Sequence, residues 1–157
     1  PDLVRTYDRH GVELLVNRSV EVVHGGRTLL VTGLDDLVLG APNPAAALAT
    51  MSRRDHHLVL AHCPAARDAL GLPPEHPASL VLSGHTHGGQ IAPLGIAAWR
   101  PAGSGRYVAG WYTDGGPPLY VSCDTHGRHD RSDRCPPPRL RPLCSSPATA
   151  SIPSPGR

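Results

Sequence analysis

Residues 80–90 are Leu-Val-Leu-Ser-Gly-His-Thr-His-Gly-Gly-Gln, a short apolar run that stops at two histidines flanked by glycines. A run of Leu and Val of this length predicts a strand buried on both faces, and the glycines allow a sharp turn directly after it. In extended chain, side chains at positions i and i+2 point to the same side. We therefore expect His85 and His87 to face one pocket at the carboxyl end of this strand, as two metal ligands would.

A second strand that ends in histidine is predicted upstream. Residues 57–62 are His-Leu-Val-Leu-Ala-His, followed by Cys63 and Pro64. In open α/β sheets, ligands gather at the carboxyl ends of the strands. We therefore predict that His62, His85 and His87 converge on a metal site. A surface loop that carries histidines by chance is the alternative, and it stays open at this point.

Composition and charge limit the class of protein. The 157 residues suffice for one domain with a core, and with two Trp, four Tyr and no Phe that core is expected to be aliphatic. Residues 1–122 hold 9 Arg and 10 acidic residues, whereas residues 123–157 hold 6 Arg and 3 Asp. Neither part has the clustered basic residues of a nucleic-acid-binding surface. A structural nucleic-acid partner is therefore not expected.

The sequence contains no recognisable membrane or secretion signal. No stretch approaches the roughly 18 apolar residues of a membrane span, and residues 1–10 lack the layout of a secretory signal. The first residue is Pro1 rather than Met. We expect the true beginning of the protein to lie upstream, where any membrane anchor would also lie. The compartment stays open between cytoplasmic and membrane-associated.

Four cysteines show no paired C-x-x-C spacing, which favours free thiols in a reducing compartment. They are Cys63, Cys123, Cys135 and Cys144. A zinc site of Cys123, His126, His129 and Cys135 can be drawn as an alternative. The Gly, Arg and Asp residues between these positions provide no hydrophobic scaffold for it, so free thiols are expected.

Turn and cap signals predict the remaining elements. Residues 1–10 are expected to be the end of a helix, and residues 11–15 a short strand. Strands at 20–23 and 28–33 form a hairpin through Gly25 and Gly26. Asn43 caps a helix that begins at Pro44 and runs to Met51.

Downstream, a crossover unit and a second hairpin are predicted. A helix over 64–70, ending at Gly71, joins the two strands that end in histidine. Residues 91–99 are expected to be an irregular rim, and residues 106–122 a second hairpin. Two hairpins beside a buried crossover imply an α/β protein with a mixed sheet or with two packed sheets, covered by helices.

Two carboxylates and several further histidines have less specific surroundings. Asp35 and Asp36 follow a predicted strand and could be metal ligands, a general base or loop acids. Asp is common in turns because its side chain bonds the local backbone, which favours the loop interpretation. Five histidines outside the candidate site are expected to be solvated or structural. They are His10, His24, His56, His57 and His76.

Together, these motifs resemble the C-terminal half of a calcineurin-like metallophosphoesterase, in the bacterial branch that includes membrane-associated phosphohydrolases. The resemblance covers about residues 1–122. It is carried by Gly11-Val12 with Leu15 and Asn17, by Gly-Leu-Asp-Asp at 33–36 and by His-Cys-Pro at 62–64, where the family usually has His-Asn-Pro. The Gly-His-Thr-His-Gly-Gly-Gln at 84–90 is highly specific. The closing strands of the family resemble residues 105–107 and 119–122.

The resemblance implies a fold, a reaction and a ligand set. The fold is a two-sheet α-β-β-α sandwich, and the reaction is hydrolysis of phosphoric esters by metal-activated water. The cofactors are two divalent or trivalent ions of Mn, Fe or Zn, with His62 and His85 on one and His87 on the other. The substrate is a small phosphate ester or a lipid-linked one, and membrane association would come from a segment upstream.

The resemblance also implies what this chain lacks. The first half of the family supplies Asp-x-His at a strand end, a Gly-Asp with the bridging carboxylate, and a Gly-Asn-His turn. No predicted strand ends in Asp-x-His, and neither Gly-Asp nor Gly-Asn-His occurs in the chain. We expect the chain alone to be inactive or nearly so. The alternative is a non-catalytic remnant or binding module of the same fold.

Residues 123–157 depart from the family's ending. They are rich in Arg, Pro, Ser and Cys, whereas the family continues with a Gly-rich segment and a last strand. A one-base shift of GC-rich codons near position 123 gives a peptide closer to that ending, so we hypothesise a frameshift. A segment of this composition buries too little apolar surface to fold, and we expect disorder from about Asp124 onward.

Overall fold

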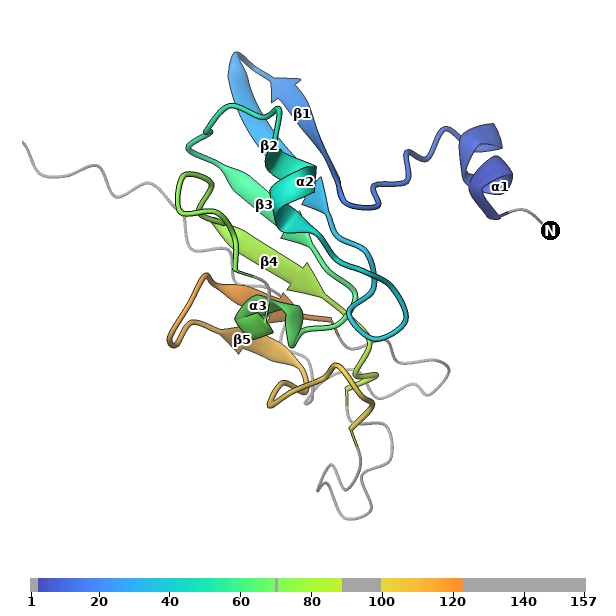
Figure 1. The fold of residues 1–157 in the computed structure, drawn as a ribbon, viewed down its shortest axis with the longest axis vertical. Coiled ribbons are helices and arrows are strands. Elements are labelled where there is room, and N and C mark those ends of the chain that lie inside the picture. The colour runs from blue at the N-terminus through green and yellow to red at the C-terminus, as the bar shows by residue number, and fades with distance from the viewer. Residues whose placement is uncertain (1–2, 70, 89–99, 123–157) are drawn as a thin grey trace, which may run out of the picture.

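A mixed sheet of six strands organises the chain in the computed structural model, which describes residues 3–69, 71–88 and 100–122 (Figure 1). The strand order is β1-β2-β3-β4-β6-β5. Strands β2, β3, β4 and β6 are parallel, and β1 and β5 pair antiparallel at the two edges. The strands are β1 Arg18–His24, β2 Arg27–Gly33, β3 His57–Leu60, β4 Leu80–Ser83, β5 Gly110–Tyr112 and β6 Leu119–Val121. The predicted α/β class is confirmed, as a mixed sheet.

Both predicted hairpins are present. In the first, His24 pairs with Arg27 across a two-residue turn, and Gly25 and Gly26 have φ of 56° and 74°. Positive φ at both central residues gives a turn whose twist matches that of the strands, which explains the paired glycines. The second hairpin joins β5 to β6 and is shorter than predicted, because its first strand begins at Gly110.

Helix α2, Pro44–Leu48, begins as predicted. The side chain of Asn43 accepts a hydrogen bond of 2.9 Å from the Ala46 backbone N–H, and Pro44 occupies the first turn. The helix ends three residues earlier than predicted. Ala49 and Met51 donate to the carbonyls three residues back, so the helix tightens into turns after Leu48.

Helix α3, Ala66–Ala69, lies on the crossover between the parallel strands β3 and β4. It is shorter than the predicted helix over 64–70. The N–H groups of Ala66 and Arg67 bond the carbonyls of Cys63 and Pro64, three residues back, so the entry is a tight turn rather than α-helix. The predicted strand-helix-strand unit is nevertheless confirmed.

The N-terminal segment differs from the prediction at one point. Helix α1, Leu3–Arg9, confirms the expected helix end, and Gly11 (φ 66°) follows it in the left-handed conformation common after helices. Residues 11–15, however, are not a strand. Val12 and Leu14 are about half exposed, and among the described residues no strand pairs with this linker.

Asn17 ties this linker to the loop before α2. Its Oδ1 accepts hydrogen bonds from the backbone N–H groups of Asp35 (3.1 Å) and Asn43 (2.8 Å). Its Nδ2 donates to the Ala41 carbonyl at 2.8 Å. Three bonds from one amide explain why Asn17 takes the uncommon φ of 50°, which Asn tolerates better than most residues.

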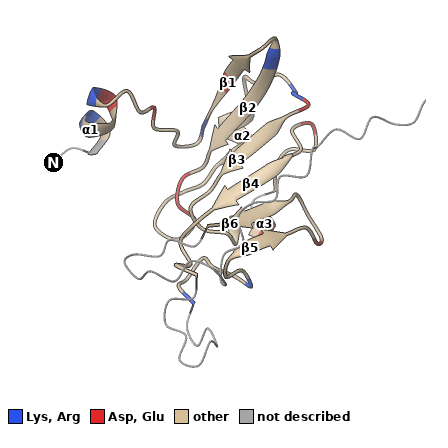
Figure 2. Ribbon diagram, turned by 180° about the vertical axis from the view of Figure 1, so that it is seen from behind, with Lys and Arg blue, Asp and Glu red and all other residues tan. Residues whose placement is uncertain are grey.

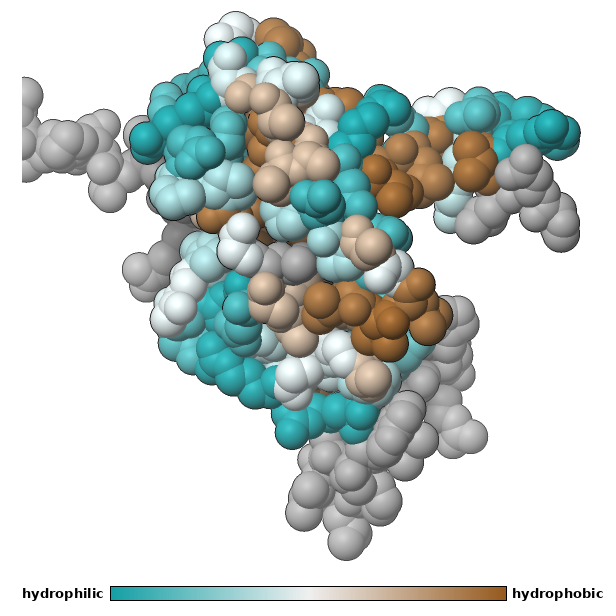
Figure 3. Space-filling model, in the orientation of Figure 1, coloured by the Kyte–Doolittle hydropathy of each residue, from teal (hydrophilic) through white to brown (hydrophobic). Residues whose placement is uncertain are grey.

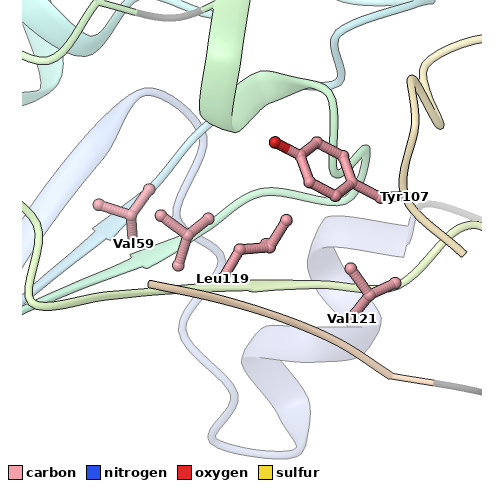
Figure 4. Close-up of a cluster of buried hydrophobic side chains, with 5 residues drawn as sticks. Val59, Tyr107, Leu119 and Val121 are labelled. Atoms are coloured by element: carbon pink, nitrogen blue, oxygen red, sulfur yellow. The ribbon is translucent and has the colours of Figure 1, made fainter. Parts of the chain in front are cut away.

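The core lies between the sheet and α3, and it is not purely aliphatic. Val59, Val81, Leu119 and Val121 pack around Tyr107, whose side chain is fully buried (Figure 4). Tyr107 stacks edge-to-face on Tyr112, with ring centroids 4.7 Å apart. The expectation of an aliphatic core was therefore wrong, because Tyr107, which lies in an irregular segment before β5, fills the centre of the core.

The opposite face of the sheet is apolar and carries no helix among the described residues. Leu58, Leu60, Leu80 and Leu82 alternate with the buried Val59 and Val81 and therefore point to this other side. Figure 2 shows this side of the sheet, on which most of the Arg, Asp and Glu residues lie at strand ends and in loops. The described residues form one sheet and leave this face without a second layer.

Two of the predicted segments fall outside the described residues. They are the rim at 91–99 and the tail at 123–157, including Cys123, Cys135, Cys144 and the drawn zinc alternative. Within the described ranges, no helix has the length and hydropathy needed to cross a bilayer.

Candidate metal centre

The two strands that end in histidine meet as the sequence predicts. Leu60 of β3 and Leu82 of β4 are register partners in a parallel pair, so both chains leave the sheet at the same edge. Beyond that edge, the Gly84 N–H donates to the His62 carbonyl at 3.1 Å. His85 Nδ1 then lies 3.2 Å from His62 Nε2, and the rings meet edge-to-face with centroids 4.9 Å apart.

The distance between these two nitrogens fits a shared metal ion. Two imidazole nitrogens bound at about 2.0–2.1 Å to one tetrahedral zinc ion lie about 3.4 Å apart. The observed 3.2 Å is close to that value. His62 is exposed and His85 is half-buried, so the pair is open to solvent and to an ion. The two imidazole nitrogens are of a kind and spacing that could bind one transition-metal ion.

His87 does not join this pair in the structure. Its side chain is exposed, and both His85 (φ 69°) and His87 (φ 50°) have left-handed backbone. The expectation that the two histidines face one side assumed extended chain, and the turn at this point removes that alternation. Among the described residues, no group of three His, Cys, Asp or Glu side chains is placed to hold a metal ion.

Asp35 and Asp36 act as loop acids. Asp35 accepts from the N–H groups of Asp36 (2.8 Å) and Ala41 (3.0 Å), and Asp36 Oδ1 accepts from those of Val38 and Leu39, both at 2.8 Å. The bond from the Leu39 N–H is the main cause that lowers the pKa of Asp36, and the nearby His62 also contributes. The bonds that hold this loop therefore occupy both carboxylates.

Cys63 directly follows His62 and is bonded to the Asp36 loop. Its buried thiol lies 3.4 Å from Asp36 Oδ2, as a donor to that carboxylate. Burial is the main cause that raises the pKa of Cys63 to about 11, and Asp36 adds to it. A thiol that stays protonated is a poor metal ligand and a poor nucleophile. Cys63 is free, in agreement with the expectation for the part of the chain described.

An open groove of about 390 Å³ runs beside the histidine pair. Linker residues 13–15 form one side, and the carboxyl ends of β3 and β4, including His62, form the other. Its floor is apolar, with Leu60 and Leu82 exposed to the groove. A ligand in this groove would lie on leucine side chains with one imidazole at its edge.

Apolar side chains also surround the edge of the sheet. Figure 3 shows hydrophobic surface on the linker after α1 and on the loop between β2 and α2. In the linker, Val12 and Val16 are about half exposed, and in the loop Val38 is 45% and Leu39 is 92% exposed. Exposed apolar side chains therefore gather on this linker and on this loop, which the hydrogen bonds of Asn17 join.

Sequence reasoning missed one contact of the pair. His85 Nε2 lies 2.6 Å from the backbone carbonyl oxygen of Ala102. Ala102 belongs to residues 101–108, an irregular segment that packs against both strand exits. Every residue has a backbone carbonyl, so the type of residue at position 102 does not indicate that its carbonyl accepts this bond. The positive φ of Gly103 (89°) and Gly105 (58°) is the nearest local signal of an unusual path there.

Two of the remaining histidines are structural, as expected. His57 Nε2 lies 2.8 Å from Thr32 Oγ1, which lies 2.7 Å from Ser19 Oγ, and His57 Nδ1 lies 3.3 Å from the His76 carbonyl. Both His57 and His76 are buried, at the amino ends of the strands and away from the histidine pair. The Asp-x-His triplet at 8–10 overlaps the end of α1 and the one at 55–57 leads into β3, so neither follows a strand, and a third at 124–126 lies outside the described residues.

A mixed α/β sheet with paired histidines at the carboxyl ends of two parallel strands defines a candidate metal centre. Over part of its length, the chain is related to the metallophosphoesterases. YkuE of Bacillus subtilis, an uncharacterized metallophosphoesterase, is 37% identical over 98 residues, which are 62% of this chain and 33% of that protein. YaeI of Escherichia coli, a phosphodiesterase, is 33% identical over 114 residues, 71% of this chain and 40% of that protein.

YpbG of Bacillus subtilis, an uncharacterized protein, is 29% identical over 89 residues, which are 57% of this chain and 34% of that protein. No family model matches the chain. No solved structure matches it. The chain spans about a third to two fifths of the length of these curated relatives.

Proposed function

We propose that this chain is part of a metal-dependent phosphoesterase that hydrolyses a phosphate ester, with a phosphodiester as the first candidate. The observation that carries the proposal is the approach of His62 Nε2 to His85 Nδ1, 3.2 Å apart at the carboxyl edge of the sheet. The printed names of YkuE and YaeI, a metallophosphoesterase and a phosphodiesterase, support the same chemistry.

In this proposal, His62 and His85 hold one ion, and His87 is a ligand of a second. Ions of Mn, Fe or Zn all accept imidazole nitrogen, so the residues leave the metal open. Such an ion supplies an activated water and neutralises charge on the phosphoryl oxygens. The chain's own part is to orient two imidazoles and to offer the apolar groove beside them to the organic part of the ester.

The finer fold proposed is the two-sheet α-β-β-α sandwich. Its support is the uncovered apolar face, where Leu60 and Trp111 are each 37% exposed and Val22 is 48% exposed. A sheet needs a second layer on each apolar face, and a second sheet would pack about 10 Å away. Residues 1–122 would be the C-terminal part of that sandwich, and 123–157 a separate tail.

The proposal also holds that this chain alone is inactive. Three imidazoles are too few for a two-metal site, and Asp35 and Asp36 are engaged by backbone N–H groups. The missing ligands, including a bridging carboxylate, would come from a longer protein. On the family resemblance, the proposal extends to a lipid-linked substrate and to membrane association through a segment of the longer protein.

The alternative function is a non-catalytic remnant or binding module. One observation favours it: the described residues contain no cluster of three potential metal ligands. In that case the histidine pair holds one adventitious ion or none, and the apolar face binds another polypeptide.

Metal content separates the two functions. We would dialyse this chain and a longer protein that includes the Asp-x-His and Gly-Asn-His segments against Mn²⁺ or Zn²⁺, and then measure bound metal by mass spectrometry. The proposal expects two ions in the longer protein, and loss of metal from its His62→Asn and His85→Asn variants but not from His24→Asn. If the longer protein retains no metal, the remnant interpretation is correct.

A further inference from the structure

The irregular 101–108 segment offers a backbone carbonyl to one histidine of the proposed metal site, and its role rests on that site. Ala102 O is a carbonyl oxygen and accepts hydrogen bonds without donating them. The nitrogen 2.6 Å away, His85 Nε2, therefore carries the proton. A neutral imidazole has one N–H, so His85 Nδ1 is left with its lone pair directed at His62.

The position of the proton on His62 follows from that on His85. Because His85 Nδ1 is the acceptor across the 3.2 Å contact, His62 Nε2 is the donor and carries the proton of that ring. The two rings are therefore not equivalent. His85 already presents a free lone pair at the nitrogen that faces the site, whereas His62 must release its Nε2 proton to water and take one up at Nδ1 before Nε2 can bind an ion.

Hydrogen bonds hold the 101–108 segment to the chain just after His62 and just after His85. Beyond His62, the Ala65 N–H donates to the Gly103 carbonyl at 3.0 Å, and Gly103 lies so close to Cys63 that a Cβ there would come 2.8 Å from the thiol sulfur. Beyond His85, the hydroxyl of the buried Thr86 donates to the Val108 carbonyl. The carbonyl of Ala102 is thus positioned by both strand exits.

Tyr107 anchors the segment in the core. Its hydroxyl donates to Asp68 of α3 at 2.7–2.8 Å and accepts from Arg67 Nη1 at 3.0 Å and from Arg106 Nη2 at 3.2 Å. The Arg67 side chain is fully buried and also donates to the Pro117 carbonyl at 2.7 Å. These bonds join the segment to the helix that follows His62 and to the β5–β6 hairpin.

We propose that the 101–108 segment, held by Tyr107 and Thr86, is a positioning element that fixes the tautomer of His85 so that Nδ1 is free to bind a metal ion. Tyr107 and Thr86 touch neither imidazole ring in this scheme and act through the Ala102 carbonyl. Partners of this kind, which accept the second N–H of a ligating histidine, commonly change metal affinity by about 10–100-fold when removed.

The first test needs no variant. Long-range ¹H–¹⁵N NMR of the imidazole rings, at a pH well above the histidine pKa, identifies the protonated nitrogen in each ring of the 157-residue chain. We expect protonated Nε2 in both His62 and His85 before metal is added. When Zn²⁺ is titrated in, His62 should change to protonated Nδ1 while His85 keeps its proton on Nε2.

Variants then test the positioning role. Thr86→Val and Tyr107→Phe each remove one hydroxyl that holds the segment, and Tyr120→Phe on the opposite face is the matched control. We expect the first two to give averaged His85 tautomers and about tenfold weaker Zn²⁺ binding, and the control to match the unmodified chain. Circular dichroism checks that each variant is folded, and if Tyr107→Phe does not fold, Thr86→Val carries this test.

Two results would overturn the inference: a His85 ring protonated on Nδ1 in the unmodified chain, or folded variants with unchanged His85 tautomer and Zn²⁺ affinity. If His85 has the expected tautomer but Zn²⁺ shifts neither ring, the histidine pair of this chain alone holds no metal ion while the positioning contact stands, and the metal content of the longer protein decides the proposed function. The two failures are therefore distinguishable.

Discussion

The two faces of the sheet offer a quantitative test of the sandwich fold, through matched Leu→Ala substitutions. Leu119 of β6 is fully buried in the core beside Tyr107, and Leu60 of β3 is 37% exposed on the uncovered face. Truncating a buried leucine removes its transfer free energy and leaves a cavity, which together cost about 2–5 kcal/mol. For Leu119, packed on all sides, we expect a loss of about 3 kcal/mol.

For Leu60, both contributions are smaller. About a third of the side chain already contacts solvent, and no packed layer surrounds the resulting gap, so we expect a loss of about 1 kcal/mol in this chain. In a longer protein whose second sheet covers this face, the same Leu60→Ala change should cost about 3 kcal/mol, like Leu119→Ala.

The assay is urea unfolding followed by far-ultraviolet circular dichroism, on both variants in both proteins. The free energy of unfolding is obtained by linear extrapolation, and the m-values must agree before the losses are compared. The sandwich would be refuted if Leu60→Ala cost the same small amount in the short chain and in the longer protein, because the face would then be uncovered in both.

Three further predictions follow from the buried polar groups and the helix cap. Burial lowers the pKa of His57 from its usual value of 6.5, so the unfolded chain binds more protons below that pH, and the stability present above about pH 6.5 is lost on acidification. The His57→Gln variant should show a flatter dependence of the urea midpoint on pH, and an unchanged slope would contradict this prediction. The thiol of Cys63, whose pKa is raised to about 11, should resist alkylation by iodoacetamide at about pH 8 until urea unfolds the chain. Peptide mass spectrometry measures this, and alkylation of the folded chain would contradict the burial of Cys63. Asn43→Ala should lower the free energy of unfolding by about 1 kcal/mol through loss of the α2 cap, with the exposed Ser52→Ala as the control; equal urea midpoints for the two variants would show that the cap contributes nothing.

Local signals in the sequence predicted most of the sheet. Paired glycines at 25 and 26 determine a tight hairpin, and apolar runs that end at His62 and His85 determine two buried parallel strands. These features depend on neighbouring residues, so the local pattern carries them. The prediction of a strand at 11–15 was wrong. A strand needs a partner strand, and five residues of sequence do not show whether a distant segment pairs with them.

The candidate site was predicted less completely than the fold. Parallel strands bring His62 and His85 to one edge, which the sequence indicates. The position of His87 depends on left-handed backbone at two non-glycine residues, which the alternation rule does not foresee. The contact of His85 with Ala102 joins residues seventeen positions apart through a backbone oxygen, and no side-chain pattern encodes it.

The central claim is that these histidines belong to a phosphoesterase, and hydrolysis of bis-p-nitrophenyl phosphate with added Mn²⁺ tests it most directly. We would measure release of p-nitrophenol by this chain, by a longer protein that includes the missing ligand segments, and by the His85→Asn and His24→Asn variants of the longer protein. The account predicts turnover by the longer protein and its His24→Asn variant, and none above background by the short chain or the His85→Asn variant. Turnover by the short chain, or undiminished turnover after His85→Asn, would contradict it.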